Sequence, residues 1–446
     1  MKHVLLLGAG RSAVYLIDFL IRQAASQTWQ VTIADLDTEH VRTRLTESAL
    51  IHLVNLDIHN QENLIAQVQL VDLVISMLPA SFHLPVAKIC LAYKKHFLTA
   101  SYVTPELRAL HEAVKQKNLL FLMEMGLDPG VDHLSAMATI ASIRERGGEL
   151  VAFKSYTGGL VAPESDTNPW HYKISWNPRN VVLAGQGTAR YLQKGKLKYI
   201  PYHQLFHRTE QMMVPGLGML EGYANRDSLV YRTAYGLEAI PTMLRGTLRW
   251  PGFCAAWHQL VKLGLTDDSY VIPESAHTTY AQWLESYLPV TIHTNLEARL
   301  AAFLDLPVES PEIAAVRYLG LLADEKIHKP AATPAQILEQ RLVQKLKLAP
   351  TDKDLVVMQH EFTFLLNQEK RCLKSALVVK GQDATYTAMA RTVGLPLAFA
   401  AELMLENKIN STGVHIPVLP ELYQPILARL NNNGLTFTEQ EEILKN

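Results

Sequence analysis

The first third of the chain alternates short apolar runs with helix-like patterns. This alternation predicts a parallel sheet covered by helices, because parallel strands need a crossover connection between them. The number of apolar runs is that of a complete Rossmann domain. We expect strands near His3–Leu7, Gln30–Ala34, Ile51–Leu56, Leu73–Met77, Phe97–Ala100 and Leu119–Met123. We expect helices at Ala13–Ala25, Gln61–Gln69, Leu84–Tyr93 and Pro105–Lys117. The sequence therefore predicts an α/β fold with an N-terminal doubly wound parallel sheet.

The rest of the chain predicts further parts. From Val151 to about Asn225 it is rich in strand-like segments, and from Gly236 to Asp352 it is mainly helical. The strand-like segments are Ala152–Tyr156, Val181–Leu183, Lys198–Pro201, Asp354–Glu361 and Arg371–Val379. The main helical patterns are Pro311–Leu322, Ala335–Leu348, Tyr386–Glu406 and Glu421–Asn431. We predict a Rossmann domain at 1–130, a mixed α+β substrate domain at 131–235 with 353–390, a small helical subdomain at 236–352, and C-terminal helices at 391–446 that pack back on the Rossmann domain.

Composition argues against several classes of protein. The chain has 42 Lys plus Arg against 43 Asp plus Glu, so no bulk charge attracts nucleic acid or an anionic membrane. Its three cysteines lack CxxC spacing, and its histidines lack metal-ligand spacing, so we expect no metal. We find neither a stretch of about 18 apolar residues nor a targeting peptide. These features predict a cytoplasmic protein without nucleic-acid or membrane partners, and a homodimer is the default assembly.

The segment Gly8–Ala13 matches the pattern G-x-G-x-x-G/A, and it follows a predicted strand and opens a predicted helix. In such a turn the first glycine bends the chain, the second lets the backbone approach a pyrophosphate, and the last small residue allows helix and strand to pack closely. The helix N-terminus then offers N–H groups to the phosphates. The predicted cofactor-binding residues of this turn are Gly8, Gly10, Arg11, Ser12 and Ala13.

Asp35 ends the second predicted strand. A carboxylate there accepts hydrogen bonds from a ribose 2′-hydroxyl and repels a 2′-phosphate, so NAD is favoured over NADP. Asp37 competes for this role, and Arg11 is able to neutralise phosphate. The alternative is that the glycines merely turn the chain and Asp35 caps the next segment. The other strand ends on this edge add the cofactor-binding candidates Asp57, Ser76, Met77, Leu78 and Ser101, although Asp57 is nearly as well explained as a solvated loop acid.

Three segments carry more unusual chemistry than a core requires. They are Ser101–Pro105, Gly126–His133 and Ser155–Leu160. The first two follow the fifth and sixth strands, on the edge where the nicotinamide end of a dinucleotide would lie. For Asp132 and His133 the simpler interpretation is a capped helix start with a hydrogen-bonded histidine.

These segments resemble the glutamate-forming saccharopine dehydrogenases. The resemblance covers most of the chain, through Asn168–Trp176, Tyr223–Ser228, Arg245–Arg249, Asp354–Phe362, Gly394–Pro396 and Gly413–Val414. It implies that saccharopine is oxidised with water to glutamate and 2-aminoadipate 6-semialdehyde, or formed from them in reverse. It also implies that Asp128 and Tyr102 are the catalytic residues. Asp128 would stabilise an iminium ion or pass protons, and Tyr102 would position the amine or the attacking water.

The resemblance also suggests residues that bind an amino-acid substrate with three carboxylates. Arg226 is the first choice for a bidentate carboxylate contact, and the N–H groups of Gly158 and Gly159 offer another. Lys173 is a weaker choice, because an interdomain salt bridge explains it equally well. Thr157 stands where fungal members have Cys, which argues against essential thiol chemistry. Those members use NADPH with a basic residue near the position of Asp35, so the acid here suggests a changed cofactor preference.

Two alternatives stay open. A related C–N oxidoreductase, such as a carboxynorspermidine dehydrogenase or a homospermidine synthase, would use the same architecture on other amines and aldehydes. A non-catalytic dinucleotide-binding redox sensor would use only the cofactor site, and it would not need Tyr102, Asp128 and Arg226. The segments Ser155–Gly159 and Asn225–Asp227 favour saccharopine.

Overall fold

The computed structural model describes residues 1–43, 48–290 and 295–445. The chain divides into two compact units, which are described separately below. Unit 1 comprises Met1–Glu149 with Thr385–Thr438, and unit 2 comprises Leu150–Ala384 with Glu439–Asn446. The sequence analysis ended the first domain at residue 130. In the structure α7 (Val131–Glu145) also belongs to unit 1, because it packs against α16 (Pro420–Asn432).

Within the described ranges, the sheet of unit 1 has seven parallel strands in the order β17-β6-β5-β4-β1-β2-β3. Their bounds are β1 His3–Leu7, β2 Gln30–Asp35, β3 Ile51–Asn55, β4 Leu73–Ser76, β5 His96–Thr99, β6 Leu120–Leu122 and β17 Gly413–His415. The predicted doubly wound fold is confirmed. The sequence analysis did not predict β17, because a three-residue strand leaves no alternating pattern. The strand order reverses between β1 and β4, and open α/β sheets bind ligands at such a point.

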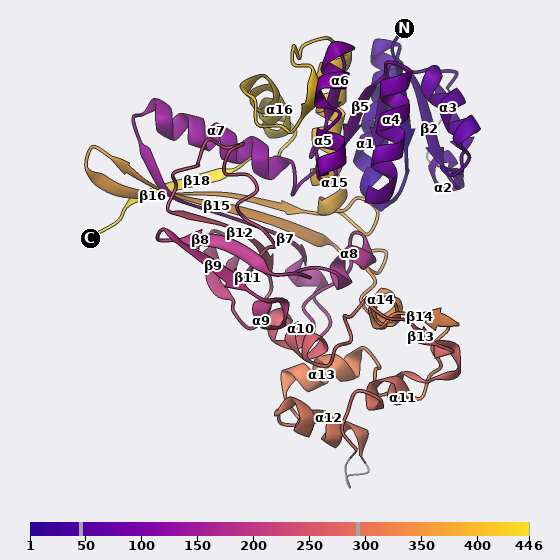
Figure 1. Ribbon diagram of the computed structural model, residues 1–446, viewed down its shortest axis with the longest axis vertical. Helices are drawn as coiled ribbons and strands as arrows, with labels where there is room; N and C mark the ends of the chain where they lie inside the picture. Colours follow the sequence, from indigo (N-terminus) through magenta and orange to yellow (C-terminus); the bar gives the residue numbers. More distant parts are fainter. Residues whose placement is uncertain (44–47, 291–294, 446) are drawn as a thin grey trace. The chain divides into compact units, whose positions relative to one another are not determined.

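The late helices complete unit 1. α15 (Ala388–Leu405) packs against α1, β4, β5 and α16, and Figure 1 shows these orange and yellow segments among the indigo and purple elements of the same unit. By length and composition α15 would be able to cross a membrane, but 83% of its apolar window is buried in the structure. It is therefore well explained as a core helix. The earlier helices are α1 Val14–Gln27, α2 Glu39–Arg42, α3 Gln61–Gln69, α4 His83–Ala92, α5 Pro105–Arg108 and α6 His111–Gln116, so the helix predicted at Pro105–Lys117 is divided in two.

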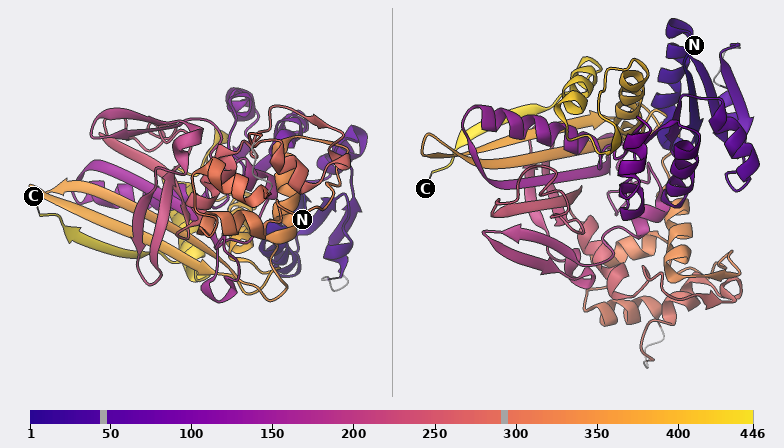
Figure 2. Two further views of the ribbon diagram at one scale, coloured as in Figure 1. Left: turned by 90° about the horizontal axis from the view of Figure 1, so that it is seen from below. Right: turned by 45° about the horizontal axis from the view of Figure 1, so that its top comes forward.

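Unit 2 is built on a mixed sheet. Its main path is β10-β11-β12-β7-β15-β16-β18, with β8 and β9 attached through β12. The strand bounds are β7 Glu149–Val161, β8 Ala189–Gln193, β9 Lys196–Ile200, β10 Glu210–Val214, β11 Gly218–Ala224, β12 Thr242–Arg249, β15 Asp354–Leu366, β16 Glu369–Lys380 and β18 Thr438–Ile443. Both views of Figure 2 show β15 and β16 as two long orange strands running side by side. Their turn contains Asn367 and Gln368, both at positive φ, as a tight hairpin turn requires.

Two local predictions in unit 2 were wrong. β12 is a strand inside the range that was predicted to be mainly helical. It pairs in parallel with β7, and this long-range pairing overrides the local pattern. Val181–Leu183 was predicted as a strand but falls at the end of α8 (Pro178–Val182). Asn177 caps this helix and Pro178 opens it.

The helices of unit 2 share one hydrophobic core with the sheet. This core joins Tyr156 and Val357 of the strands to Trp257 and Leu338 of the helices. The predicted helical subdomain at 236–352 is therefore not packed separately from the strands of unit 2. The helix bounds are α9 Tyr202–Leu205, α10 Phe253–Lys262, α11 Tyr280–Glu285, α12 Leu296–Leu304, α13 Pro311–Tyr318 and α14 Pro334–Lys345, and a two-stranded ribbon is formed by β13 Ile272–Pro273 and β14 Ala331–Ala332.

Candidate active site

The glycine turn lies at the reversal point of the sheet of unit 1. Gly8 has φ +93°, and a Cβ atom there would lie 3.0 Å from the carbonyl carbon of Met77, so both the backbone angle and the close approach require glycine. Gly10 differs, because a Cβ atom there would meet nothing within 4 Å. Its backbone thus faces open space that a ligand is able to enter. Ala13 is buried and donates its N–H to the carbonyl of Gly10 over 2.9 Å.

The helix start beyond this turn suits an anion. The short 3-10 turn Arg11–Ala13 leads directly into α1, neither has a side-chain cap, and neither has an acidic residue in its first turn. Arg11 is exposed and Ser12 is half-buried. Uncapped N–H groups with the positive end of a helix dipole favour phosphate. The open space at Gly10 and this uncapped helix start together fit the pyrophosphate of a dinucleotide.

Asp35 is engaged by the turn itself. Its Oδ2 accepts the N–H of Ala9 over 2.6 Å, and its Oδ1 accepts the N–H of Leu36 over 2.7 Å. The ring Nε2 of His40 lies 2.8 Å from the carbonyl oxygen of Ala9. The carboxylate therefore orders the turn between β1 and α1. Asp37 is exposed and accepts the N–H of Glu39 over 2.9 Å.

A buried histidine joins two of the predicted strand-end residues. His83 Nδ1 lies 3.0 Å from Ser76 Oγ, and His83 Nε2 lies 2.7 Å from Ser101 Oγ. Burial lowers the pKa of His83 from 6.5 to about 4, because a charged imidazole loses its hydration. The ring is therefore neutral at pH 7. The sequence analysis did not identify His83, since a single histidine at the start of an apolar helix matches no motif.

The remaining strand-end candidates differ in exposure. Met77 and Leu78 are half-buried directly after β4, and the N–H of Met77 donates to the carbonyl of Leu7 over 2.8 Å. Asp57 is exposed and accepts the N–H of His59 within its own loop over 2.9 Å. The structure thus favours the solvated loop acid for Asp57.

The structure brings Tyr102 and Asp128 together. The hydroxyl of Tyr102 donates to Asp128 Oδ1 over 3.5 Å, which is at the long end of a hydrogen bond. Tyr102 is 44% exposed, and Asp128 is the half-buried residue of the otherwise buried loop Gly126–Gly130. An accessible hydroxyl and an accessible carboxylate therefore lie side by side at the carboxyl edge of the sheet.

The predicted substrate residues of unit 2 have different surroundings. Thr157, Gly158 and Gly159 lie inside β7. A Cβ atom on Gly158 would lie 2.6 Å from the carbonyl oxygen of Leu248, so this glycine is required by the neighbouring strand. The hydroxyl of Thr157 is buried and has no hydrogen-bond partner among the described residues.

The two cationic candidates of unit 2 also differ. Lys173 Nζ lies 2.6 Å from Asp352 Oδ2, and both side chains are buried, so the structure favours the salt bridge over a substrate contact for Lys173. Arg226 is exposed, has φ +30°, and its carbonyl accepts the N–H of Arg190 over 2.7 Å. Within the described part of the chain, its guanidinium has no hydrogen-bond or ion-pair partner.

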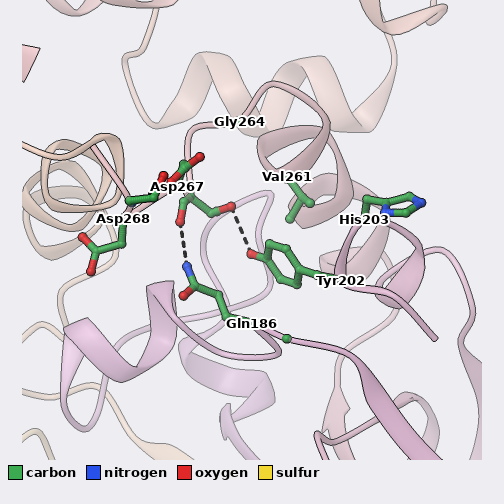
Figure 3. A pocket seen from close by; sticks show the side chains of 10 residues that line it. Gln186, Tyr202, His203, Val261, Gly264, Asp267 and Asp268 are labelled. Atoms are coloured by element: carbon green, nitrogen blue, oxygen red, sulfur yellow. Dashed lines mark hydrogen bonds between the residues drawn. The ribbon is translucent and has the colours of Figure 1, made fainter. Parts of the chain in front are cut away.

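Unit 2 also contains a pocket of about 620 Å³. Figure 3 shows Tyr202 and Gln186 at its wall, each with a hydrogen bond to another residue that lines it. These bonds run to the hydroxyl and the carbonyl of Thr266. None of the predicted site residues lines this pocket. Among the residues that the structure describes, no group of three His, Cys, Asp or Glu side chains is placed to hold a metal ion.

Comparisons with known proteins identify relatives over the whole chain. Residues 4–122 match the family model described as the saccharopine dehydrogenase NADP binding domain, and residues 126–435 match the saccharopine dehydrogenase C-terminal domain. The chain is 36% identical over 452 residues to the mitochondrial alpha-aminoadipic semialdehyde synthase of Rattus norvegicus, covering 99% of this chain and 48% of that protein. The chain thus spans about half the length of the first curated relatives that it matches.

A second group of relatives has the same length as this chain. The chain is 33% identical to saccharopine dehydrogenase [NADP(+), L-glutamate-forming] of Saccharomyces cerevisiae, and the match covers 99% of each protein. The solved apo structure of the L-Glu-forming saccharopine dehydrogenase from that yeast has a TM-score of 0.88 at 31% identity, covering 99% of this chain and all of the other. A homospermidine synthase from Legionella pneumophila has a TM-score of 0.55 at 10% identity, covering 99% of this chain and 91% of the other. This likeness shows a shared fold alone.

These comparisons contradict the prediction that the cofactor is NAD. The family model that covers Asp35 is described as an NADP binding domain, and the yeast relatives are named for NADP(+). The prediction treated Asp35 as a free carboxylate that repels a 2′-phosphate. In the structure both carboxylate oxygens accept backbone N–H groups, so the residue has a role within the turn that does not depend on the ribose. Because both domain models of the family and full-length relatives match it, the chain belongs to the saccharopine dehydrogenase family.

Proposed function

We propose that the protein catalyses the NADP-dependent oxidation of the secondary amine of saccharopine, with hydrolysis to L-glutamate and 2-aminoadipate 6-semialdehyde, or the reverse condensation, in lysine metabolism. The observation that carries the proposal is the contact between Tyr102 and Asp128 at the carboxyl edge of the Rossmann sheet. The choice of substrate is supported by the yeast relatives, which are named for saccharopine and match this chain over 99% of its length.

The reaction needs few groups from the protein. A bound nicotinamide would supply the acceptor for the hydride that leaves the carbon attached to the secondary amine. The negative charge of Asp128 then stabilises the positive charge that develops on the substrate nitrogen. The hydroxyl of Tyr102 orients the attacking water or the departing amine, and Asp128 takes up or returns the proton. This assignment uses both residues at the positions where the structure places them together.

The phosphates of the cofactor would be held by backbone rather than by a charged cluster. The open backbone of Gly10 and the uncapped start of α1 supply N–H groups, and the exposed Arg11 supplies a positive charge close to them. Asp35 keeps the turn in shape through the N–H of Ala9. In unit 2, Arg226 is our candidate for a bidentate contact with a substrate carboxylate, because it is exposed and carries a charge suited to that geometry. The expectations of a homodimer and of a cytoplasmic location stay predictions.

The proposal is tested by the absorbance of reduced nicotinamide in a mixture of saccharopine and NADP(+). We expect turnover with release of glutamate, a large loss of kcat in Asp128→Asn, and a smaller loss in Tyr102→Phe. NADP binding by calorimetry without turnover of saccharopine would refute the substrate assignment. In that case polyamine-forming amine and aldehyde pairs would be tested next.

A further inference from the structure

A buried acid and a buried histidine lie directly beside the Tyr102 loop in unit 1. Glu124 follows β6 and is 1% exposed, and His133 lies in the first turn of α7 and is 0% exposed. His133 Nε2 lies 2.8 Å from Glu124 Oε2. The sequence analysis treated His133 as a hydrogen-bonded histidine at a helix start, which the structure confirms, and it did not identify Glu124 as the partner.

This pair is costly for the fold. Burial removes the hydration of the Glu124 carboxyl group and of the His133 ring, and the hydrogen bond between them offsets only part of that cost. Glu124 also has φ +60°, a left-handed backbone that an L side chain adopts rarely. Residues with a strained backbone persist where the surrounding structure holds them, and they are frequent next to functional sites.

Glu124 fixes the chain on both sides of Tyr102. Its N–H donates to the carbonyl of Ser101 over 3.1 Å, and its Oε1 accepts the N–H of Val103 over 3.0 Å. The two residues that flank Tyr102 are therefore both held by one buried residue. Since the side chain of Tyr102 is itself 44% exposed, its direction depends on this hold on the backbone.

His133 connects the same carboxylate to the loop that carries Asp128. The N–H of His133 donates to the carbonyl of Gly130 over 2.9 Å, and Asp132 Oδ1 accepts the N–H of Gly130 over 2.6 Å. Asp132 thus anchors the loop at Gly130, the residue that directly precedes α7. The contacts run from the Tyr102 loop through Glu124 and His133 to the Asp128 loop.

We propose that Glu124 and His133 are positioning residues of the proposed reaction, which hold the hydroxyl of Tyr102 at the carboxylate of Asp128. The inference rests on the proposed function for its kinetic test. It does not require either residue to touch the substrate or the cofactor. Glu124 acts through Tyr102, and His133 acts through Glu124.

The chemistry of the pair predicts which substitution is tolerated. Both oxygens of Glu124 have a neighbour, one the N–H of Val103 and the other the ring Nε2 of His133. In Glu124→Gln, the amide oxygen still accepts from Val103, and the amide N–H₂ donates to His133 Nε2 in the other tautomer of the ring. Glu124→Ala removes both contacts. The glutamine variant should therefore rescue what the alanine variant loses.

A double-mutant cycle between Glu124 and Tyr102 tests this. We expect Glu124→Ala to lower kcat for saccharopine about 10- to 100-fold, the scale of a misplacement of about 1 Å, while the Kd for NADP stays within about twofold. Glu124→Gln should recover most of the loss. In a Tyr102→Phe background, Glu124→Ala should have little further effect, because the hydroxyl that it positions is already absent. Glu62→Ala, exposed on α3 of the same unit, is the matched control.

Effects that multiply in the double variant would overturn the proposal, since they would show that Glu124 acts independently of the Tyr102 hydroxyl. If Glu124→Ala does not fold, His133→Phe replaces it in the cycle with the same expected non-additivity. Crystal structures of the wild type and of the variant separate this inference from the proposed function. If the wild type does not turn over saccharopine, the proposed function fails. Independently of that result, an unchanged Tyr102–Asp128 contact in the crystal structure of the variant would refute the positioning role.

Discussion

Acid should destabilise unit 1 through His83. At pH 7 the ring is neutral in the folded protein and mostly neutral in the unfolded chain. As the pH falls below 6.5, the unfolded chain takes up a proton, whereas the folded protein does not until about pH 4. Stability is therefore lost between these two values. Because each pKa unit corresponds to about 1.4 kcal/mol, the full loss is about 3 kcal/mol, of which about 2 kcal/mol falls between pH 7 and pH 5.

The variant His83→Asn isolates this contribution. Asparagine keeps a polar group facing Ser76 but cannot be protonated, so the stability advantage of the wild type over the variant should shrink by about 2 kcal/mol between pH 7 and pH 5. Urea unfolding followed by circular dichroism at both pH values measures it, and the comparison cancels the other titrating groups. His59→Asn, an exposed histidine of the same unit, is the control. An advantage that is equal at the two pH values would refute the reasoning.

Four further outcomes are expected. Gly10→Ala should fold normally, since its Cβ atom meets open space, but it should bind NADP at least about tenfold more weakly in calorimetry. Gly130→Ala should fail to fold, because its Cβ atom would lie 2.0 Å from the carbonyl oxygen of Gly126. Lys173→Ala should lower the free energy of unfolding in urea by about 3–5 kcal/mol, because it leaves the carboxylate of Asp352 buried without its cation, and Lys173→Ala/Asp352→Ala should recover part of that loss. Arg226→Ala should raise KM for saccharopine with KM for NADP unchanged, and native kinetics would show that the substrate contact is elsewhere.

The cofactor turn was the most predictable part of the site. The segment Gly8–Ala13 is local in sequence, so its spacing and its place between a strand and a helix predicted the observed turn. The family resemblance implied the pair Tyr102 and Asp128, and their segments were expected to lie close together because parallel strands end at one edge of a sheet. In both cases the geometry follows from the chain next to the motif.

Other features depend on contacts that no local pattern contains. The strand β12 is fixed by pairing with β7, which lies far away in the sequence. Glu124 lies in an ordinary stretch of sequence, and only its positive φ and its contact with His133 mark it. The error at Asp35 has the same origin, since its N–H donor at Ala9 comes from another strand end. A residue type predicts chemistry, whereas its hydrogen-bond partners decide whether that chemistry is available.

The assembly of unit 1 from two distant stretches of chain has a consequence for its synthesis. During translation the strands β4 and β5 leave the ribosome long before α15, and the whole of Leu150–Ala384 must be made in between. Until α15 arrives, the apolar surface that it covers stays exposed to solvent, and such surface promotes aggregation. The stretch that carries β4 and β5 therefore completes its core only after Leu150–Ala384 has been made.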